Sequence, residues 1–77
     1  MAGKPRPKPC FLDRQVRLGA IKGELRWRNA DGDRLYTWDS LHGHIEVFDR
    51  RGQHLGSLDA VTGTFIGKPV RGRRIDV

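Results

Sequence analysis

The chain has 77 residues, one cysteine and a formal net charge of +6. This length allows one domain with a small core, and a single cysteine excludes both an intrachain disulfide and a thiolate-rich zinc site. No apolar run is long enough for a transmembrane helix, and the first residues lack the apolar stretch of an ordinary signal peptide.

The charges are unevenly distributed along the chain. Residues 1–28 contain eight basic and two acidic residues, residues 29–49 contain one and five, and residues 50–77 contain six and two. Eleven of the fifteen cations are arginine, whose planar fork matches phosphate better than lysine does. An acidic centre between basic flanks favours a polyanion as ligand, most simply nucleic acid. A merely soluble surface is the plainer interpretation.

Residues 3–9, "GKPRPKP", alternate cations with prolines. Such a sequence favours an extended, solvated arm of polyproline type, which serves either as a linker or as a tail that follows phosphates. The apolar residues after it fit neither the helical nor the strand period, and we predict a short helix over residues 12–18. Cys10 is interpreted as a small, at least partly buried thiol. We therefore assign residues 1–23 to a basic, proline-rich arm with a short helix.

Beyond residue 23 the pattern is that of short β-strands. Apolar residues alternate with polar ones, and "NADGD" at 29–33 contains the Asp-Gly signal of a hairpin. The predicted strands are ELRWR at 24–28, RLYTWDS at 34–40, GHIEVFD at 43–49, QHLGSLD at 53–59 and TFIG at 64–67, with RRIDV at 73–77 as a segment that could close the sheet. We interpret Trp27 and Trp38 as core residues. The pattern predicts a mainly β fold with a compact, strongly twisted antiparallel sheet of about five strands over residues 24–77, preceded by an extended or short helical segment.

The central stretch gathers the groups that acid–base chemistry uses. Alternate residues of a strand share a face, which places His44 and Glu46 together, about 6.6 Å apart along the strand. Asp39 and His42 lie just before them, and His54 on the next predicted strand could come alongside. An imidazole and a carboxylate at this spacing can bracket a phosphodiester, one removing a proton from the attacking group and the other protonating the leaving oxygen. If the polymer is RNA, its own 2′-hydroxyl can attack, and arginine would stabilise the charge on the phosphorane.

Two other interpretations stay open at this point. Polar residues on the solvent face of an antiparallel strand are ordinary and need no function. The His42-Gly43-His44 sequence, together with Asp39 or Glu46, also has the spacing of a metal site on a strand. The spacing alone is a weak signal for either chemistry.

Three linked motifs make the sequence more specific. They are Y-x-W-D-S-x-H-G-x-x-E, G-Q-H-L-G-S-x-D and T-G, and they run from Tyr36 to Gly63. In these motifs the chain resembles the cytotoxic domain of the ribosome-inactivating colicins and cloacin, bacteriocin ribonucleases that cut 16S ribosomal RNA in the decoding centre. The resemblance covers roughly residues 24–74. It implies a cytotoxic ribonuclease domain over residues 24–77, with metal-independent cleavage, a 2′,3′-cyclic phosphate product and no cofactor.

The resemblance also implies roles for individual residues. Glu46 corresponds to the base that activates the 2′-hydroxyl, His42 to the acid and Asp39 to the residue that orients the histidine. The catalytic arginine near the carboxyl end corresponds to Arg71. His44 stands where the family has an acidic residue, and we include it in the catalytic set because it could share or replace the role of the acid.

One distance argues for a bend in the chain. On a fully extended strand His42 and Glu46 would lie about 13 Å apart. Either the chain bends between Asp39 and Gly43, or His44 is the true partner of Glu46.

Most of the candidate RNA contacts lie in the basic flanks. The candidates are Arg26, Arg28, Arg34, Tyr36, His54, Lys68, Arg73 and Arg74. The resemblance further implies the ribosome as substrate, an acidic immunity protein as partner, and secretion or contact-dependent delivery as part of a larger toxin that acts in the target-cell cytoplasm. We expect the domain to be a monomer when alone.

Two alternatives to this ribonuclease differ from it in testable ways. A non-catalytic, basic RNA- or ribosome-binding protein would tolerate the loss of the Glu46 carboxylate, whereas an enzyme that uses it as a base would not. A metal-dependent nuclease would lose activity in excess chelator.

Overall fold

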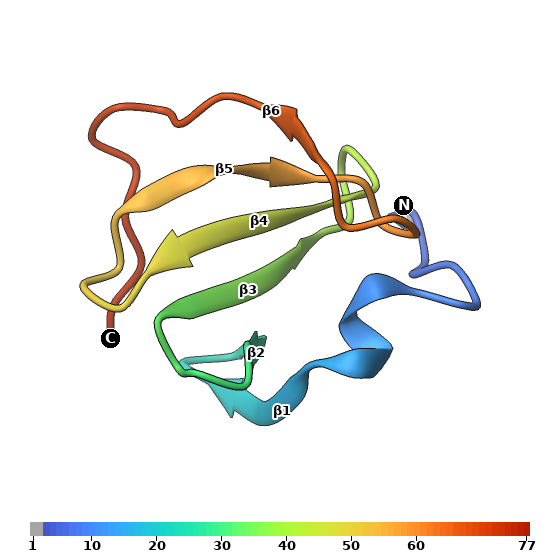
Figure 1. Ribbon diagram of the computed structural model, residues 1–77, viewed down its shortest axis with the longest axis horizontal. Helices are drawn as coiled ribbons and strands as arrows, with labels where there is room; N and C mark the ends of the chain where they lie inside the picture. Colours follow the sequence, from blue (N-terminus) through green and yellow to red (C-terminus); the bar gives the residue numbers. More distant parts are fainter. Residues whose placement is uncertain (1–2) are drawn as a thin grey trace.

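A computed structural model describes residues 3–77 as a six-stranded antiparallel sheet in which each strand pairs with the next one in the chain (Figure 1). One 3-10 helix precedes the sheet. The elements are η1 Phe11–Arg14, β1 Val16–Ile21, β2 Glu24–Arg28, β3 Arg34–Asp39, β4 His44–Asp49, β5 His54–Leu58 and β6 Phe65–Gly67. Within the described residues, no helix combines the length and the apolar character needed to cross a membrane.

The predicted mainly β fold is confirmed, with one strand more than expected. Strands β2 to β6 agree with the five predicted strands to within one residue at each end. The predicted helix over 12–18 is wrong in its second half, because only Phe11–Arg14 is helical and β1 follows it. A bulge between Arg17 and Gly19 shifts the register of β1 and interrupts the two-residue alternation that would have marked a strand. The closing segment at 73–77 forms only one bridge, between Gln53 and Arg74.

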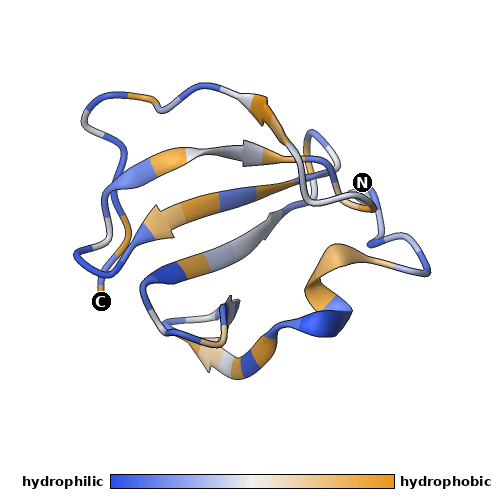
Figure 2. Ribbon diagram, viewed as in Figure 1, coloured by the Kyte–Doolittle hydropathy of each residue, from blue (hydrophilic) through white to orange (hydrophobic). Residues whose placement is uncertain are grey.

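The amino-terminal segment packs onto one face of the sheet and completes the core. Leu12 of η1 is 1% exposed, and the ring of Phe11 meets Tyr36 edge-on with 5.5 Å between ring centroids. Figure 2 shows that β4 carries both polar and apolar residues. The core cluster consists of Cys10, Leu12, Trp27, Tyr36, Ile45, Val47 and Leu58, with Trp38 packed against it. Cys10 and the two tryptophans therefore lie where the sequence placed them.

The proline-rich arm at residues 3–9 contains no helix or strand, and it is attached to the sheet. The backbone N–H of Lys4 donates to the carbonyl of Ser40 over 2.7 Å, and Trp38 Nε1 donates to the carbonyl of Lys4 over 3.0 Å. The Arg6 guanidinium lies 5.0 Å from the centroid of the Trp27 ring. The arm thus lies beside the β3–β4 turn. The first two residues of the predicted arm lie outside the described residues.

The opposite face of the sheet carries a row of polar side chains. Thr37 pairs with Arg26 on β2 and with Glu46 on β4, and Glu46 pairs in turn with Ser57 on β5. All four are buried. Cross-strand neighbours lie close enough for direct contact, so the register alone brings Ser57 to Glu46.

The carboxyl-terminal segment, residues 68–77, covers this polar row. The backbone N–H of Val70 donates to His54 Nδ1, and that of Ile75 donates to the carbonyl of Gly52. The Arg26 guanidinium donates to the carbonyl of Asp76. Gly52 permits this approach, because a Cβ there would lie only 2.2 Å from the carbonyl oxygen of Ile75. Both faces of the small sheet are therefore covered by a chain terminus.

Candidate active site

The turn between β3 and β4 is organised by Asp39. Its Oδ1 accepts hydrogen bonds from the backbone N–H groups of Leu41 and His42 over 3.0 and 3.2 Å. Its backbone carbonyl accepts from the N–H of Gly43 over 2.7 Å, and Gly43 has a φ of 75°, which glycine adopts without strain. The chain therefore bends between Asp39 and Gly43, which is one of the two alternatives that the distance argument left open. His42 returns over Asp39, with 2.8 Å between His42 Nδ1 and Asp39 Oδ2.

His44 joins this pair to Glu46. It lies directly opposite Asp39 in the β3–β4 register. Its Nε2 is 3.3 Å from Asp39 Oδ2 and 3.8 Å from Glu46 Oε1. The rings of His42 and His44 are stacked, with centroids 5.4 Å apart and an interplanar angle of 9°. Four of the five predicted catalytic residues thus form one continuous cluster.

Glu46 is buried, at 7% exposure, and both of its oxygens are engaged. Oε2 accepts from Ser57 Oγ over 2.7 Å and lies 2.9 Å from His54 Nε2. Oε1 accepts from an Arg73 guanidinium nitrogen over 2.7 Å. Two of these partners, His54 and Ser57, lie on β5, and Arg73 comes from the carboxyl-terminal segment.

The tautomer of His54 follows from its neighbours. A backbone N–H can only donate, so the hydrogen bond of 2.8 Å from Val70 makes His54 Nδ1 an acceptor. The proton of the neutral ring is then on Nε2, which donates it to Glu46. The His54 side chain, which was predicted to contact RNA, is fully buried in this structure. It holds the Glu46 carboxylate in position.

Hydrogen bonding keeps both carboxylates of the cluster ionised. Burial raises the pKa of Glu46, but the hydrogen bonds from His54 and Ser57 outweigh it and leave that pKa below its ordinary value. Burial likewise opposes ionisation of Asp39, and the hydrogen bonds from His42 outweigh it, so that its pKa is also lowered. Glu46 can therefore enter a reaction as a proton acceptor.

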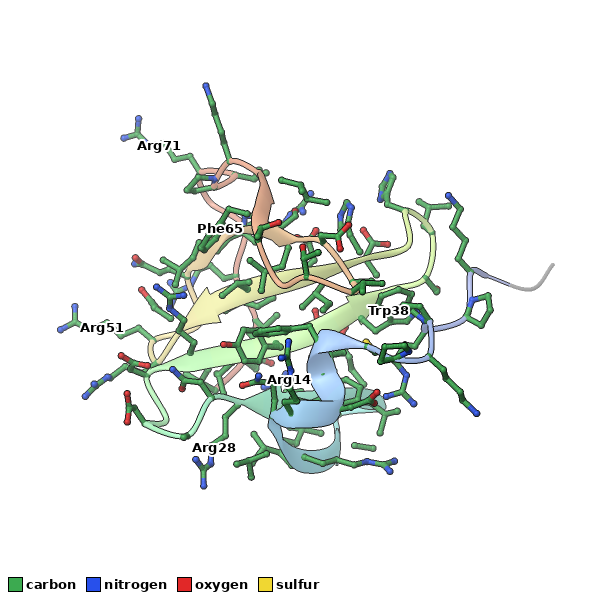
Figure 3. All side chains as sticks on the ribbon, turned by 45° about the vertical axis from the view of Figure 1, so that its right-hand side comes forward. Arg14, Arg28, Trp38, Arg51, Phe65 and Arg71 are labelled. Carbon is green, nitrogen blue, oxygen red and sulfur yellow. The ribbon has the colours of Figure 1, made fainter. Side chains whose placement is uncertain are left out.

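The arginine that contacts Glu46 is Arg73, whereas the resemblance implied Arg71 as the catalytic arginine. Arg71 is exposed, and Figure 3 shows its side chain pointing away from the sheet. Both arginines line a pocket of about 370 Å³ to which His54 also contributes. Arg71 therefore lies at the edge of the site, whereas Arg73 contacts the carboxylate within it.

The other predicted RNA contacts divide into buried and accessible residues. Arg26 and Tyr36 are only 4% and 3% exposed, so their side chains lie inside the domain and not on its surface. Arg26 binds the Asp76 carbonyl, and Tyr36 belongs to the core. The remaining members are exposed or half-buried. They are Arg28, Arg34, Lys68, Arg73 and Arg74.

Sequence reasoning missed two contributions to this site. Ser57 was not singled out, because its pairing with Glu46 depends on a bulge between Val47 and Phe48 that no sequence signal marks. Lys4 was not considered part of the site either, yet its aliphatic side chain packs against Gly43, with Cδ only 2.8 Å from where a Cβ of Gly43 would be.

The cluster also has the geometry of a metal site. Asp39, His42 and His44 each offer one ligand atom, and these atoms all lie within 4.8 Å of one another. The interpretation of the His-Gly-His sequence as metal ligands thus remains compatible with the fold.

Comparisons with known proteins agree with the motifs. The model of the Cytotoxic family matches residues 13–76. The chain is 43% identical over 51 residues to colicin E3 of Escherichia coli and 41% identical over 51 residues to colicin-E6 of the same organism. Each alignment covers 65% of this chain but only 9% of the relative, so the chain spans a small fraction of the length of these proteins. The predicted resemblance is confirmed, and the chain belongs to the Cytotoxic family of colicin E3-like domains.

Proposed function

We propose that this domain is an endoribonuclease that cuts 16S ribosomal RNA in the decoding centre and thereby stops translation. The observation that carries the proposal is the continuous cluster in which His42, Asp39, His44, Glu46 and Arg73 are each in contact with the next. It combines an ionised carboxylate, two imidazoles and a guanidinium, which are the groups that attack by a 2′-hydroxyl requires. The reaction proceeds without a metal and leaves a 2′,3′-cyclic phosphate.

Glu46 is the base in this mechanism. Its Oε2 is occupied by Ser57 and His54, so the 2′-hydroxyl approaches Oε1. The Arg73 side chain that now contacts Oε1 is 48% exposed, and it can move onto the phosphate as the RNA enters. There its guanidinium stabilises the negative charge that develops on the phosphorane.

His42 is the acid, and His44 positions the cluster. His42 contacts Asp39 through Nδ1, which leaves Nε2 on a ring whose side chain is 63% exposed to protonate the leaving 5′-oxygen. Asp39 fixes the orientation of that ring. The Nε2 of His44 faces the carboxylates of Asp39 and Glu46 instead, and its side chain is only 23% exposed.

The family and the net charge support a proposal for the parent protein of the domain and for its partner. The relatives are far longer than this chain, which supports a role as the nuclease part of a larger toxin, secreted or delivered by contact and active in the target-cell cytoplasm. A chain of net charge +6 suits an acidic immunity protein, because complementary charge accelerates association. The isolated domain is a monomer in this proposal.

Incubation of the purified domain with intact bacterial ribosomes in excess chelator tests the proposal. We expect a single short 3′ fragment of 16S RNA, and a decrease of at least about 10²-fold in its rate of formation with Glu46→Gln. Glu24→Gln is the matched control, because Glu24 lies on β2 with a half-exposed side chain and should leave the rate unchanged.

Binding to the ribosome, measured by co-sedimentation, separates the ribonuclease from a non-catalytic RNA-binding protein. The ribonuclease predicts that Glu46→Gln binds at least as well as the unmodified domain, since one negative charge is removed. Intact RNA with both proteins, despite binding, would refute the enzyme.

A further inference from the structure

We propose that Asp39, His42 and His44 form a binding site for a divalent transition metal of the Zn²⁺ class, and that the bound ion inhibits the domain reversibly. The inhibition rests on the proposed ribonuclease function, whereas metal binding stands on the geometry alone. The ion would be an inhibitor and not a cofactor, since it occupies groups that the acid–base mechanism needs.

The three ligand atoms are already close to a metal-binding arrangement. Asp39 Oδ2 lies 2.8 Å from His42 Nδ1 and 3.3 Å from His44 Nε2, and all three atoms fit within 4.8 Å. Tetrahedral Zn²⁺ with bonds near 2.0–2.1 Å places neighbouring ligand atoms about 3.3 Å apart. The ligand atoms therefore lie near the required spacing, and the two parallel rings must rotate so that one ion lies in the plane of both.

The ligand set selects the class of ion. Two imidazoles with one carboxylate suit Zn²⁺, Ni²⁺ or Cu²⁺, whereas Mg²⁺ and Ca²⁺ prefer oxygen ligands alone. Three protein ligands leave further coordination positions for water. His42 supplies the open side of the site, since its side chain is 63% exposed.

The backbone holds the ligands in place before an ion arrives. Asp39 Oδ1 is engaged by the N–H groups of Leu41 and His42, which aims Oδ2 at the two rings. The stacked rings present their nitrogens on the same side as Asp39. His44 is directly opposite Asp39 in the sheet. The site is thus formed by a turn and a strand pair and not by mobile side chains alone.

The consequence for catalysis follows from the shared atoms. An ion bound to His42 Nδ1, Asp39 Oδ2 and His44 Nε2 takes the place of the Asp39 contact that orients the proposed acid. The His42 ring is then held by the ion and not by Asp39. Cleavage therefore stops while the ion is bound.

Isothermal titration calorimetry with ZnCl₂ tests the site directly. We expect one ion per chain with a dissociation constant in the micromolar range or below. His44→Gln and Asp39→Asn should each weaken the affinity for zinc by more than about tenfold, because even residues that only hydrogen-bond to a metal ligand contribute that much. Asp76→Asn is the matched control for charge, because Asp76 is an exposed carboxylate paired with Lys22 away from the site. Circular dichroism checks that each variant is folded.

Cys10 is the competing explanation for zinc binding, because it is the one thiol of the chain. It is buried, and Cys10→Ser should bind zinc with unchanged affinity. Three outcomes would each overturn the proposed site: Cys10→Ser no longer binds zinc, His44→Gln binds it with unchanged affinity, or the unmodified domain does not bind it.

The cleavage assay tests inhibition separately. With ribosomes as substrate, ZnCl₂ at several times its dissociation constant should suppress cleavage, and excess chelator should restore it. Stimulation by zinc would overturn the inhibitory role. If no cleavage occurs in chelator, the proposed function and the inhibition fail together, while calorimetry still decides the metal site.

Discussion

Replacing Arg73 with alanine tests whether the arginine in contact with Glu46 acts in the reaction. Its side chain is 48% exposed, and Glu46 keeps its hydrogen bonds to His54 and Ser57 without it. The ion pair therefore contributes only about 0–1 kcal/mol to the free energy of unfolding. A donor aimed at the charge of a transition state is worth more, about 10²–10³-fold in rate or about 2.7–4 kcal/mol. We therefore expect Arg73→Ala to lower the single-turnover cleavage rate by about 10²–10³-fold while the denaturation midpoint hardly changes.

Arg71→Ala is the matched control for this experiment. Arg71 lines the same pocket and carries the same charge, but it does not contact Glu46 among the described residues. Its removal should weaken ribosome binding, reduce the salt dependence of binding by about one phosphate contact, and change the saturated cleavage rate by less than about tenfold. If Arg71→Ala lowers the saturated cleavage rate as much as Arg73→Ala or more, Arg73 is not the arginine that acts in the reaction.

Two further predictions concern the scaffold. Leu12→Ala should destabilise the domain by about 2–5 kcal/mol in urea denaturation, because a fully buried side chain is truncated. Leu41→Ala, at an exposed turn, is the control and should change stability by less than about 0.5 kcal/mol. Equal effects of the two substitutions would show that η1 is not part of the core. Hydrogen bonds from Thr62 and Val61 lower the pKa of Asp59 from its ordinary 3.8, so its contribution to stability is complete above pH 3.8 and is lost as the pH falls through the lower folded-state pKa. Asp59→Asn should therefore lose less stability than the unmodified domain on acidification below that pH, as measured by thermal denaturation, and an unchanged acid dependence would contradict this.

The strands after residue 23 could be predicted because each carries a local signal. Alternation marks the strands, and glycine or Asp-Gly marks the turns between them, as at residues 29–33. The strand β1 escaped prediction for a local reason as well. Its bulge at Gly19 breaks the alternation, and its apolar residues Val16 and Leu18 are exposed, so no buried face repeats with a period of two.

In the candidate site, too, the parts that depend on local sequence could be predicted, and the parts that depend on tertiary contacts could not. Alternation was enough to place His44 and Glu46 on one face, and Gly43 indicated the bend that returns His42 to Asp39. The choice between Arg71 and Arg73 could not be made from the sequence. It depends on the path of an irregular segment whose position is set by tertiary hydrogen bonds, from Val70 to His54 and from Ile75 to Gly52.

This dependence links assembly of the site to completion of the fold. Glu46 lies on the central part of the sheet, but His54 can be held as its donor only when Val70 blocks the other ring nitrogen, and Arg73 reaches it only from the same segment. Docking of residues 68–77 covers Glu46, and a buried carboxylate without partners is costly. The same segment therefore supplies a partner for the charge that it covers, and this partner, Arg73, is the proposed catalytic cation. In a domain too small for a large core, the same contacts that stabilise the fold thus orient the groups on which the proposed reaction depends.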